Sequence, residues 1–399
     1  LDQIRDLIPQ ITTPGWLGRI ATDWGSPGHG TPKSDEWRTA GTIHLPVALL
    51  RMWADKPERH EDLRWFLDLT TAVQLATRRS TSINRANEYQ QYLRRYLHGM
   101  VDRGFNLVPN HHAALHLPEF LPEFGPARGW WAYPIERQVG LLQKINTNNR
   151  FVGEMESTIL EGHHRSAYLR SLISTSAPPT ASVLRETLAI ARTALAEPTT
   201  GTLATDAPIG PADSMSFIHG RRVDHSKTVR LQPGDYNLLL DLLRTEIDPK
   251  ALNPKAQPLK RVQHMGVSFA IEDTSFDNSN VLFRRTRDGV LVPGRITNIF
   301  VHERKKDNQR LSETFVVLER FIRAEAHEQL FFRSLHPDLQ ALLYHTHTRS
   351  DGTSWGGEKT IIRLSQVKCH IATLPFMNKG GEERLLTWAI DRVGDFAAV

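Results

Sequence analysis

The chain has 399 residues, of which 40% are hydrophobic and 23% charged, so it can bury a sizeable globular core. Its 49 Lys and Arg against 44 Asp and Glu give a net charge of +5, which permits contact with nucleic acid without demanding it. A single cysteine, Cys369, excludes an internal disulfide and a four-thiolate zinc site, and it favours the nucleus or cytoplasm over an oxidising compartment.

Two further expectations follow from the hydropathy of the sequence and from its first residues. No run of about 18 apolar residues occurs and nothing near the first residue resembles a signal peptide, so we expect no membrane partner. Residue 1 is Leu1 rather than Met, and the first helix is predicted to start at once. We therefore expect the chain to be a processed or excised part of something longer.

Residues 1–171 are predicted to form a helical domain. The Gly- and Pro-rich run at 14–37 predicts a structured loop that tryptophans hold to the core. Apolar residues then recur at helical spacing in 61–80 and in 87–105, which indicates two amphipathic helices.

The composition changes at about residue 172. Ser, Thr, Pro and Ala dominate 172–182 and 197–216, so we predict a linker zone over 172–258 with short helices, one of them at 235–246. From residue 259 the apolar residues follow the period of strands, broken by polar turns. The predicted strands lie at 267–271, 280–285, 290–304, 313–322 and 360–374. The predicted fold is thus α+β, with a helical N-terminal domain and a small β-barrel-like domain at 259–399.

The most distinctive segment is 109–148, where loop and helix signals meet. It holds HLPEF at 116–120, a Gly-Pro pair, two adjacent tryptophans, YPIER at 133–137, and a helix that contains LLQ. Together these features resemble a conserved region of CACTA (En/Spm-type) DNA transposon proteins, which follows the main transposase core and has no assigned function. The resemblance covers residues 1–171 and extends weakly into the β-rich part.

The resemblance implies a link to transposases with an RNase H-like core, in which three carboxylates hold two divalent metal ions for phosphoryl transfer. It implies that Glu136 is the last of these carboxylates. Pro134 suits the first turn of a helix, and a carboxylate in that turn is stabilised by the helix dipole. We expect Ile135, Val139 and Leu142 to form a buried stripe on this helix.

The other two carboxylates of such a core sit on or beside strands, and no strand is predicted in 1–108. We therefore expect the chain alone not to be an active enzyme, and Mg²⁺ to bind only together with a separate core. An alternative interpretation of Glu136 is a helix cap or an ion-pair partner of Arg128 or Arg137.

Histidines offer a second metal hypothesis. His112 and His116 lie one helical turn apart, and His163 and His164 follow further along the chain. A zinc site needs at least three converging ligands, so the alternative is that these histidines cap helices or lie in the core. A zinc hydrolase built on the first pair is one function that the sequence leaves open.

Candidate nucleic-acid contacts are basic side chains, which gain affinity for phosphate through the release of counterions. They are Arg137, Lys144, Arg221, Arg222, Lys227, Arg230, Lys305 and Lys306. The alternative for each of them is a solvated surface. The adjacent Trp130 and Trp131 are predicted to anchor the core rather than to stack on bases.

The strands at 290–304, 313–322 and 360–374 weakly resemble those of the bromo-adjacent-homology and chromo-like small barrels of chromatin proteins. Two further functions therefore stay open. The first is the C-terminal part of a CACTA-like transposase that lacks a complete catalytic core and assists DNA binding or transposition in the nucleus. The second is a non-catalytic adaptor whose barrel binds chromatin or another protein.

Overall fold

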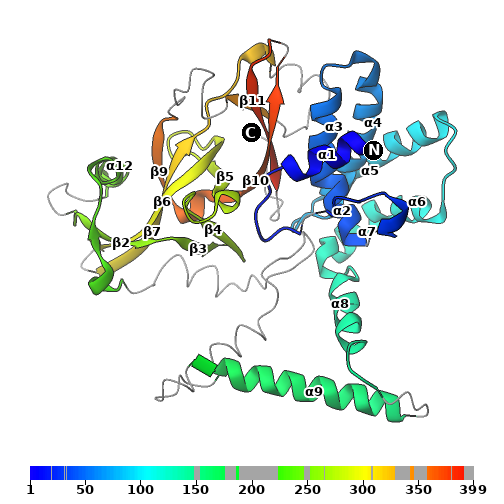
Figure 1. Cartoon of the computed structure of the whole chain (residues 1–399), viewed down its shortest axis with the longest axis horizontal. Helices are drawn as coiled ribbons and strands as arrows, with labels where there is room; N and C mark the ends of the chain where they lie inside the picture. The colour runs from blue at the N-terminus through cyan, green and yellow to red at the C-terminus, as the bar shows by residue number, and fades with distance from the viewer. Residues whose placement is uncertain are drawn as a thin grey trace. The chain divides into compact units, whose positions relative to one another are not determined.

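The computed structural model in Figure 1 gives the arrangement of helices and strands along the chain. The residues that it describes are 1–18, 20–30, 32, 34–147, 153–175, 186–187, 223–246, 252–264, 266–306, 309–328, 342–345, 357–378 and 380–390. Arg221 and Arg222, two of the predicted nucleic-acid contacts, lie outside these ranges.

Two compact units divide the chain. One unit combines Leu1–Arg128 with Thr202–Val399, and the other is Gly129–Gly201. The two units are defined by how the chain packs, whereas the domain boundaries predicted after residues 171 and 258 were based on changes in the sequence pattern. The helices before residue 128 therefore belong to the same packed body as the strands.

The first unit opens with short helices that lead into a pair of long ones. They are α1 Asp2–Leu7, η1 Ile8–Gln10, η2 Pro27–His29, α2 Ser34–Thr39, η3 Ala40–His44, α3 Leu45–Trp53, η4 Pro57–Arg59, α4 His60–Ala76, α5 Ile83–Asp102, α6 Pro109–Ala114, α7 Leu117–Phe124 and η5 Ala127–Gly129. The π-helix η3 joins α2 to α3 without a break. Pro46 lies in α3, two residues after the end of this π-helix.

The two helices predicted at 61–80 and 87–105 are confirmed as α4 and α5, which pack against each other. Leu63 and Leu67 of α4 are fully buried, because their spacing places them on one face of the helix. The hydroxyl of Ser82 caps α5 by accepting a hydrogen bond from the backbone N–H of Arg85.

The strands and the remaining helices of the first unit follow after residue 223. They are η6 His225–Lys227, β1 Val229–Arg230, α12 Pro233–Leu243, β2 Lys255–Leu259, β3 Arg261–His264, β4 Val267–Ala270, η8 Phe276–Asn278, β5 Asn280–Arg284, β6 Leu291–Lys306, β7 Gln309–Arg320, β8 Leu342–His345, β9 Lys359–Arg363, η9 Leu364–Gln366, β10 Val367–Met377 and β11 Glu383–Ile390. The single strand predicted at 360–374 was wrong, because η9 breaks it into β9 and β10, which pair with different neighbours.

Nine of these strands form one antiparallel sheet, and β3 with β4 forms a separate hairpin. The sheet runs in the order β1, β2, β6, β5, β10, β11, β8, with β7 paired to β6 and β9 paired to β7. The sheet branches at the long strand β6. One edge of β6 pairs with β7, and the other edge pairs with β5 near its start and with β2 further along the strand. A bulge between Ile296 and Asn298 separates the two halves of β6.

The predicted α+β class is confirmed, and its strands pair in antiparallel fashion. No closed barrel is detected in the strands that the structure describes. The chain beyond β7 does return to the sheet, since Arg323 forms an isolated antiparallel bridge with Tyr344 of β8.

The sheet buries side chains on both faces at the β6–β7 ladder. Phe300 and Phe315 lie in a cluster with Leu239 and Leu243 of α12, so α12 covers one face. Their chain neighbours Ile299 and Val316 lie in the larger cluster, which also holds residues of α3 and α4. Successive strand residues point to opposite faces, and this explains why adjacent residues join different clusters.

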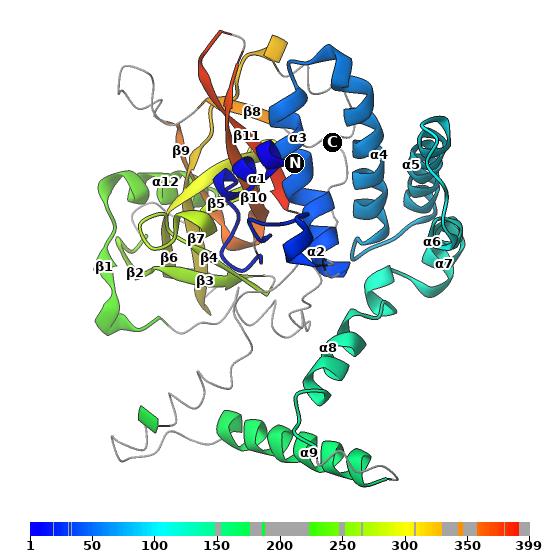
Figure 2. The ribbon, with the colours of Figure 1, turned by 45° about the vertical axis from the view of Figure 1, so that its right-hand side comes forward.

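The N-terminal helices α1 and α3 lie beside the sheet near β10 and β11 (Figure 2). Hydrogen bonds as well as apolar contacts join this segment to the sheet. The indole of Trp388 in β11 donates to the backbone oxygen of Thr42 in η3 at 3.0 Å. Thr12 and Thr373 of β10 exchange two backbone hydrogen bonds of 2.9 and 3.0 Å. The helical segment and the sheet therefore share one core.

The second unit contains α8 Tyr133–Leu142 and α9 Glu154–Thr175. A β-carbon at Gly162 of α9 would lie 2.8 Å from Cγ2 of Ile145, so glycine permits the close approach of this side chain. None of the helices in the described ranges has the length and apolar character needed to cross a bilayer.

Candidate functional site

Glu136 lies in the first turn of α8, as predicted, and its side chain is exposed. The predicted buried stripe beside it was wrong, because Ile135 is 67% exposed and Val139 is 45% exposed. Trp130 is also 41% exposed, so it does not anchor a core. The dipole of α8 favours the charge of a carboxylate in this first turn.

The metal-binding hypothesis for Glu136 requires other carboxylates or histidines nearby. Among the residues that the structure describes, no group of three or more His, Cys, Asp or Glu is arranged to hold a metal ion. Glu136 lies in one unit and the histidine pair in the other, and both metal hypotheses stay predictions.

His112 and His116 come together on the surface of the first unit. Their Nε2 atoms are 3.4 Å apart, and the two rings are nearly perpendicular at 88°. Nδ1 of His116 lies 3.5 Å from Oε2 of Glu119. His163 and His164 belong to α9 in the second unit, and their ring centroids are 6.2 Å apart.

The predicted basic contacts near α8 are only partly described. Lys144, which follows this helix, has an exposed side chain, and for Arg137 within the helix the structure describes the backbone alone. The same is true of Lys305 and Lys306 at the end of β6.

The structure brings two basic runs, far apart in sequence, to the same end of the sheet. Strand β1, which carries Arg230, pairs with β2, and β2 pairs with β6, the strand that ends at Lys305 and Lys306 (Figure 2). Register places Lys305 opposite Arg310 of β7. We call this region the basic sheet end, and its cations are Lys227, Arg230, Lys255, Lys305, Lys306 and Arg310.

The basic sheet end keeps an excess of positive charge. Among the described residues, the carboxylates that pair with its six cations are Asp224 and Glu303, and six minus two leaves +4. The Lys227 ammonium lies 2.9 Å from Asp224, and Arg310 lies 3.5 Å from Glu303. Hydrogen bonds from Ser226 and Lys227 lower the pKa of the Asp224 carboxyl to about 2, so it is ionised at neutral pH.

A buried charge cluster lies directly beside the basic sheet end. Arg304 of β6 contacts Glu313 of β7 at 2.6 Å, and Arg363 of β9 donates to the same carboxylate at 2.9 Å. Glu246 completes the cluster by pairing with both arginines. The side chains of Arg304 and Glu313 are only 2% and 6% exposed, so burying these charges depends on their mutual pairing.

The buried cluster lies on one face of β6. His302 and Arg304 point to that covered face, whereas Glu303 between them pairs with exposed partners. Strand alternation was the signal that could have separated these two residues from Glu303.

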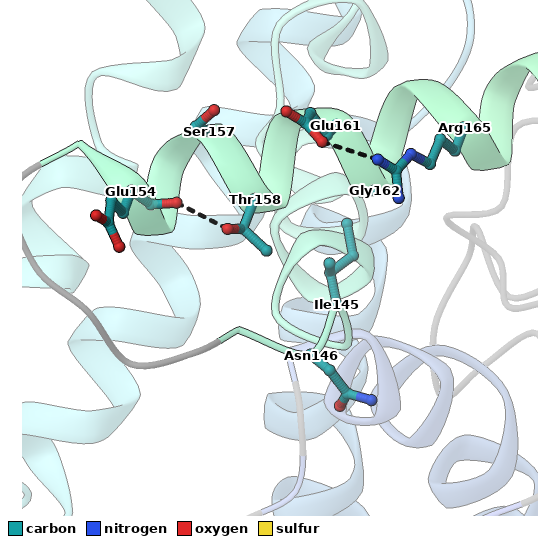
Figure 3. Close-up of a pocket in the computed structure, with 8 residues that line it drawn as sticks. All are labelled: Ile145, Asn146, Glu154, Ser157, Thr158, Glu161, Gly162 and Arg165. Atoms are coloured by element: carbon teal, nitrogen blue, oxygen red, sulfur yellow. Dashed lines mark hydrogen bonds and ion pairs between the residues drawn. The ribbon is translucent and has the colours of Figure 1, made fainter.

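The second unit contains a shallow hollow of about 370 Å³ along α9. Figure 3 shows Glu154, Ser157 and Thr158 on the helix above it, with Ile145 pointing toward Gly162. Hydrogen bonds within the helix already engage part of the lining, since Thr158 donates to the backbone of Glu154 and Glu161 accepts from Arg165.

Comparison with known proteins identifies no relative: no protein family, no curated protein and no solved structure matches this chain. The site must therefore be interpreted from its own geometry. Of the arrangements in the described part of the chain, the basic sheet end gathers the most of the predicted contact residues.

Proposed function

We propose that the chain is a non-catalytic, nucleic-acid-binding part of a transposon-derived protein of the CACTA type. The observation that carries the proposal is the convergence of Lys227, Arg230, Lys305 and Lys306 at the basic sheet end, although about 75 residues separate the two runs in sequence. Their excess positive charge suits a phosphate backbone, because each neutralised phosphate releases counterions. A DNA-binding role also agrees with the proposed location in the nucleus.

Catalysis by such a protein would depend on acids supplied elsewhere. Glu136 is one exposed carboxylate on α8, whereas two-metal phosphoryl transfer needs several carboxylates around the ions. We therefore propose that Mg²⁺ and strand cleavage belong to a separate core, and that this chain helps to hold the DNA.

Binding to duplex DNA, measured by fluorescence anisotropy at several salt concentrations, tests the proposal. Two double variants remove charge from the basic sheet end: Arg230→Gln with Lys255→Gln, and Lys305→Gln with Lys306→Gln. Each lost phosphate contact should lower the slope of log affinity against log salt by about 1, so each double variant should lower it by about 2.

The matched control removes two exposed charges from the helices, with Lys56→Gln and Arg94→Gln. This variant should retain the slope of the unmodified chain. Equal losses in all three variants, or binding that does not depend on salt, would refute the assignment of the basic sheet end.

The second candidate function is a protein- or histone-binding adaptor built on a small barrel. The bridge between Arg323 and Tyr344 favours it, because it links the end of β7 to β8 and would bring the sheet toward closure. An array of modified and unmodified histone peptides separates the candidates. Binding to peptides without salt-dependent binding to DNA would favour the adaptor.

A further inference from the structure

The exposed pair His112 and His116 has the geometry of a chelating site. His112 belongs to α6, and His116 lies four residues on, immediately before α7. A tight turn joins the two helices, with backbone hydrogen bonds from Leu115 to His112 and from His116 to Ala113, and it brings both rings to the same point on the surface. Their Nε2 atoms face each other at 3.4 Å with ring planes at 88°.

The separation of the two nitrogens suits a shared metal ion. Two nitrogens that bind Zn²⁺ at about 2.0–2.1 Å with a tetrahedral angle lie about 3.3–3.4 Å apart. A square-planar ion with similar bonds would bring them to about 2.9 Å. The observed 3.4 Å fits the tetrahedral ion. Without an ion, the same distance allows a long N–H···N hydrogen bond between the two rings.

The surroundings of His116 match those of a metal-bound imidazole. Oε2 of Glu119 lies 3.5 Å from Nδ1, the nitrogen that faces away from His112. Carboxylates at this position orient a ligating histidine and raise its basicity. The ring of Phe120 also lies near His116, with a centroid distance of 6.5 Å and an interplanar angle of 29°. His111 is not counted as a ligand, because its Nδ1 accepts a hydrogen bond from the backbone N–H of Val108.

We propose that His112 and His116 bind one tetrahedral divalent transition-metal ion of the Zn²⁺ class through their Nε2 atoms. Glu119 is a positioning residue for His116. The pair supplies two protein ligands, one fewer than a catalytic zinc site has, and no group of three candidate ligands is found in the described part of the chain. The site is therefore a surface chelate rather than a structural or catalytic zinc centre, and water fills the remaining positions. This site is independent of the proposed DNA contacts, which lie on the sheet.

The test uses the full chain, with Zn²⁺ titrated by calorimetry and Co²⁺ followed by its visible d–d absorption. We expect His112→Gln and His116→Gln each to weaken Zn²⁺ binding at least tenfold, and Glu119→Gln to weaken it about tenfold. Bound Co²⁺ should show the intense absorption of a tetrahedral site rather than the weak absorption of a hexahydrate.

The control variant carries His163→Gln and His164→Gln on α9. Adjacent helical residues point in different directions, so this pair cannot chelate an ion, and its removal should leave Zn²⁺ affinity unchanged. Far-UV circular dichroism of each variant checks folding, which should persist because His112 is exposed and His116 half-exposed. Zn²⁺ binding that survives His112→Gln, or a Co²⁺ spectrum of octahedral type, would overturn the proposal.

Discussion

His264 shows how burial changes the acid–base behaviour of a single side chain. It lies in β3, is 6% exposed, and its ring packs 6.1 Å from that of Phe269. Burial lowers its pKa to about 4, because the charged imidazolium loses its water, and Lys368 adds repulsion. A backbone hydrogen bond at Val367 opposes this shift only in part. The fold therefore holds His264 as a neutral ring.

This shift predicts a loss of stability in acid. The unfolded histidine binds its proton near pH 6.5 and the folded one only near pH 4, so the unfolded state gains protons first as the pH falls. His264 should therefore contribute stability that is complete above pH 6.5 and falls by about 3 kcal/mol on the way to pH 4. Urea unfolding at a series of pH values measures this loss.

The variant His264→Gln should be less stable at pH 7 and should show a flatter decline between pH 6.5 and 4. His98→Gln, at an exposed position of α5, serves as the control and should follow the unmodified chain. An unchanged acid slope in His264→Gln would show that other groups, such as the buried His302, whose pKa burial also lowers, account for the decline.

At the level of residues, the sequence predicted the position of a side chain within its helix better than the burial of that helix. It placed Glu136 in the first turn of a helix, which the structure confirms, but it also predicted a buried stripe there, which is wrong. Burial depends on what covers a helix, and the periodicity of one segment does not contain that information. Arg304 illustrates the same point. It directly precedes Lys305 and Lys306, two of the predicted nucleic-acid contacts, and yet the fold buries its side chain.

At the scale of elements, the backbone of strand β6 at Gly294 lies very close to the backbone of the paired strand β7. A β-carbon there would lie 2.8 Å from the backbone oxygen of Glu319 and 3.2 Å from the ring of Phe283. The first of these atoms belongs to the backbone of the paired strand β7 and cannot rotate away. Glycine is therefore required by contact rather than by backbone conformation.

Gly294→Ala should destabilise the protein by about 1–3 kcal/mol, the usual effect of forcing an extra methyl group into a packed site. The matched substitution is Gly234→Ala in the first turn of α12, where a β-carbon would have no neighbour within 4 Å. Alanine there should be neutral or slightly stabilising. Equilibrium unfolding in urea compares the two variants, and similar stabilities would contradict the role given to Gly294.

The strands that alternation predicted are those with a clear apolar face, such as β5 and β7. β2 was missed because it is short and contains Pro258, which argues against a strand in a sequence pattern. β11 was missed because most of its residues are buried, and a continuous apolar run does not distinguish a strand from a helix.

At the scale of the whole molecule, the helices and the sheet of the first unit share one hydrophobic core, so we expect them to unfold together. The core cluster contains Leu50 and Leu63 of the helices together with Leu386 and Ile390 of β11. Such pairing between distant segments could not be predicted from the sequence, because Trp388 and its partner Thr42 are 346 positions apart. Local sequence patterns predicted helices and strands, whereas the contacts between these elements form only in the completed fold.

Cooperativity of this kind is measurable by hydrogen exchange with mass spectrometry. Peptides from α3 and from β10 should lose protection at the same urea concentration. Trp388→Phe, which removes the hydrogen bond to Thr42, should lower both midpoints together, by about 1–3 kcal/mol in unfolding free energy. Loss of protection in α3 alone would show that the helices unfold separately from the sheet.

The bond between Thr42 and Trp388 also has a consequence for synthesis. Ribosomes add about 5–20 residues per second, so about 20–70 s pass between translation of these two positions. Throughout that interval the apolar sides of α3 and α4 have left the ribosome without the strand that will cover them. Nascent chains of this protein should therefore need chaperone protection until strand β11, which carries Trp388, has been translated.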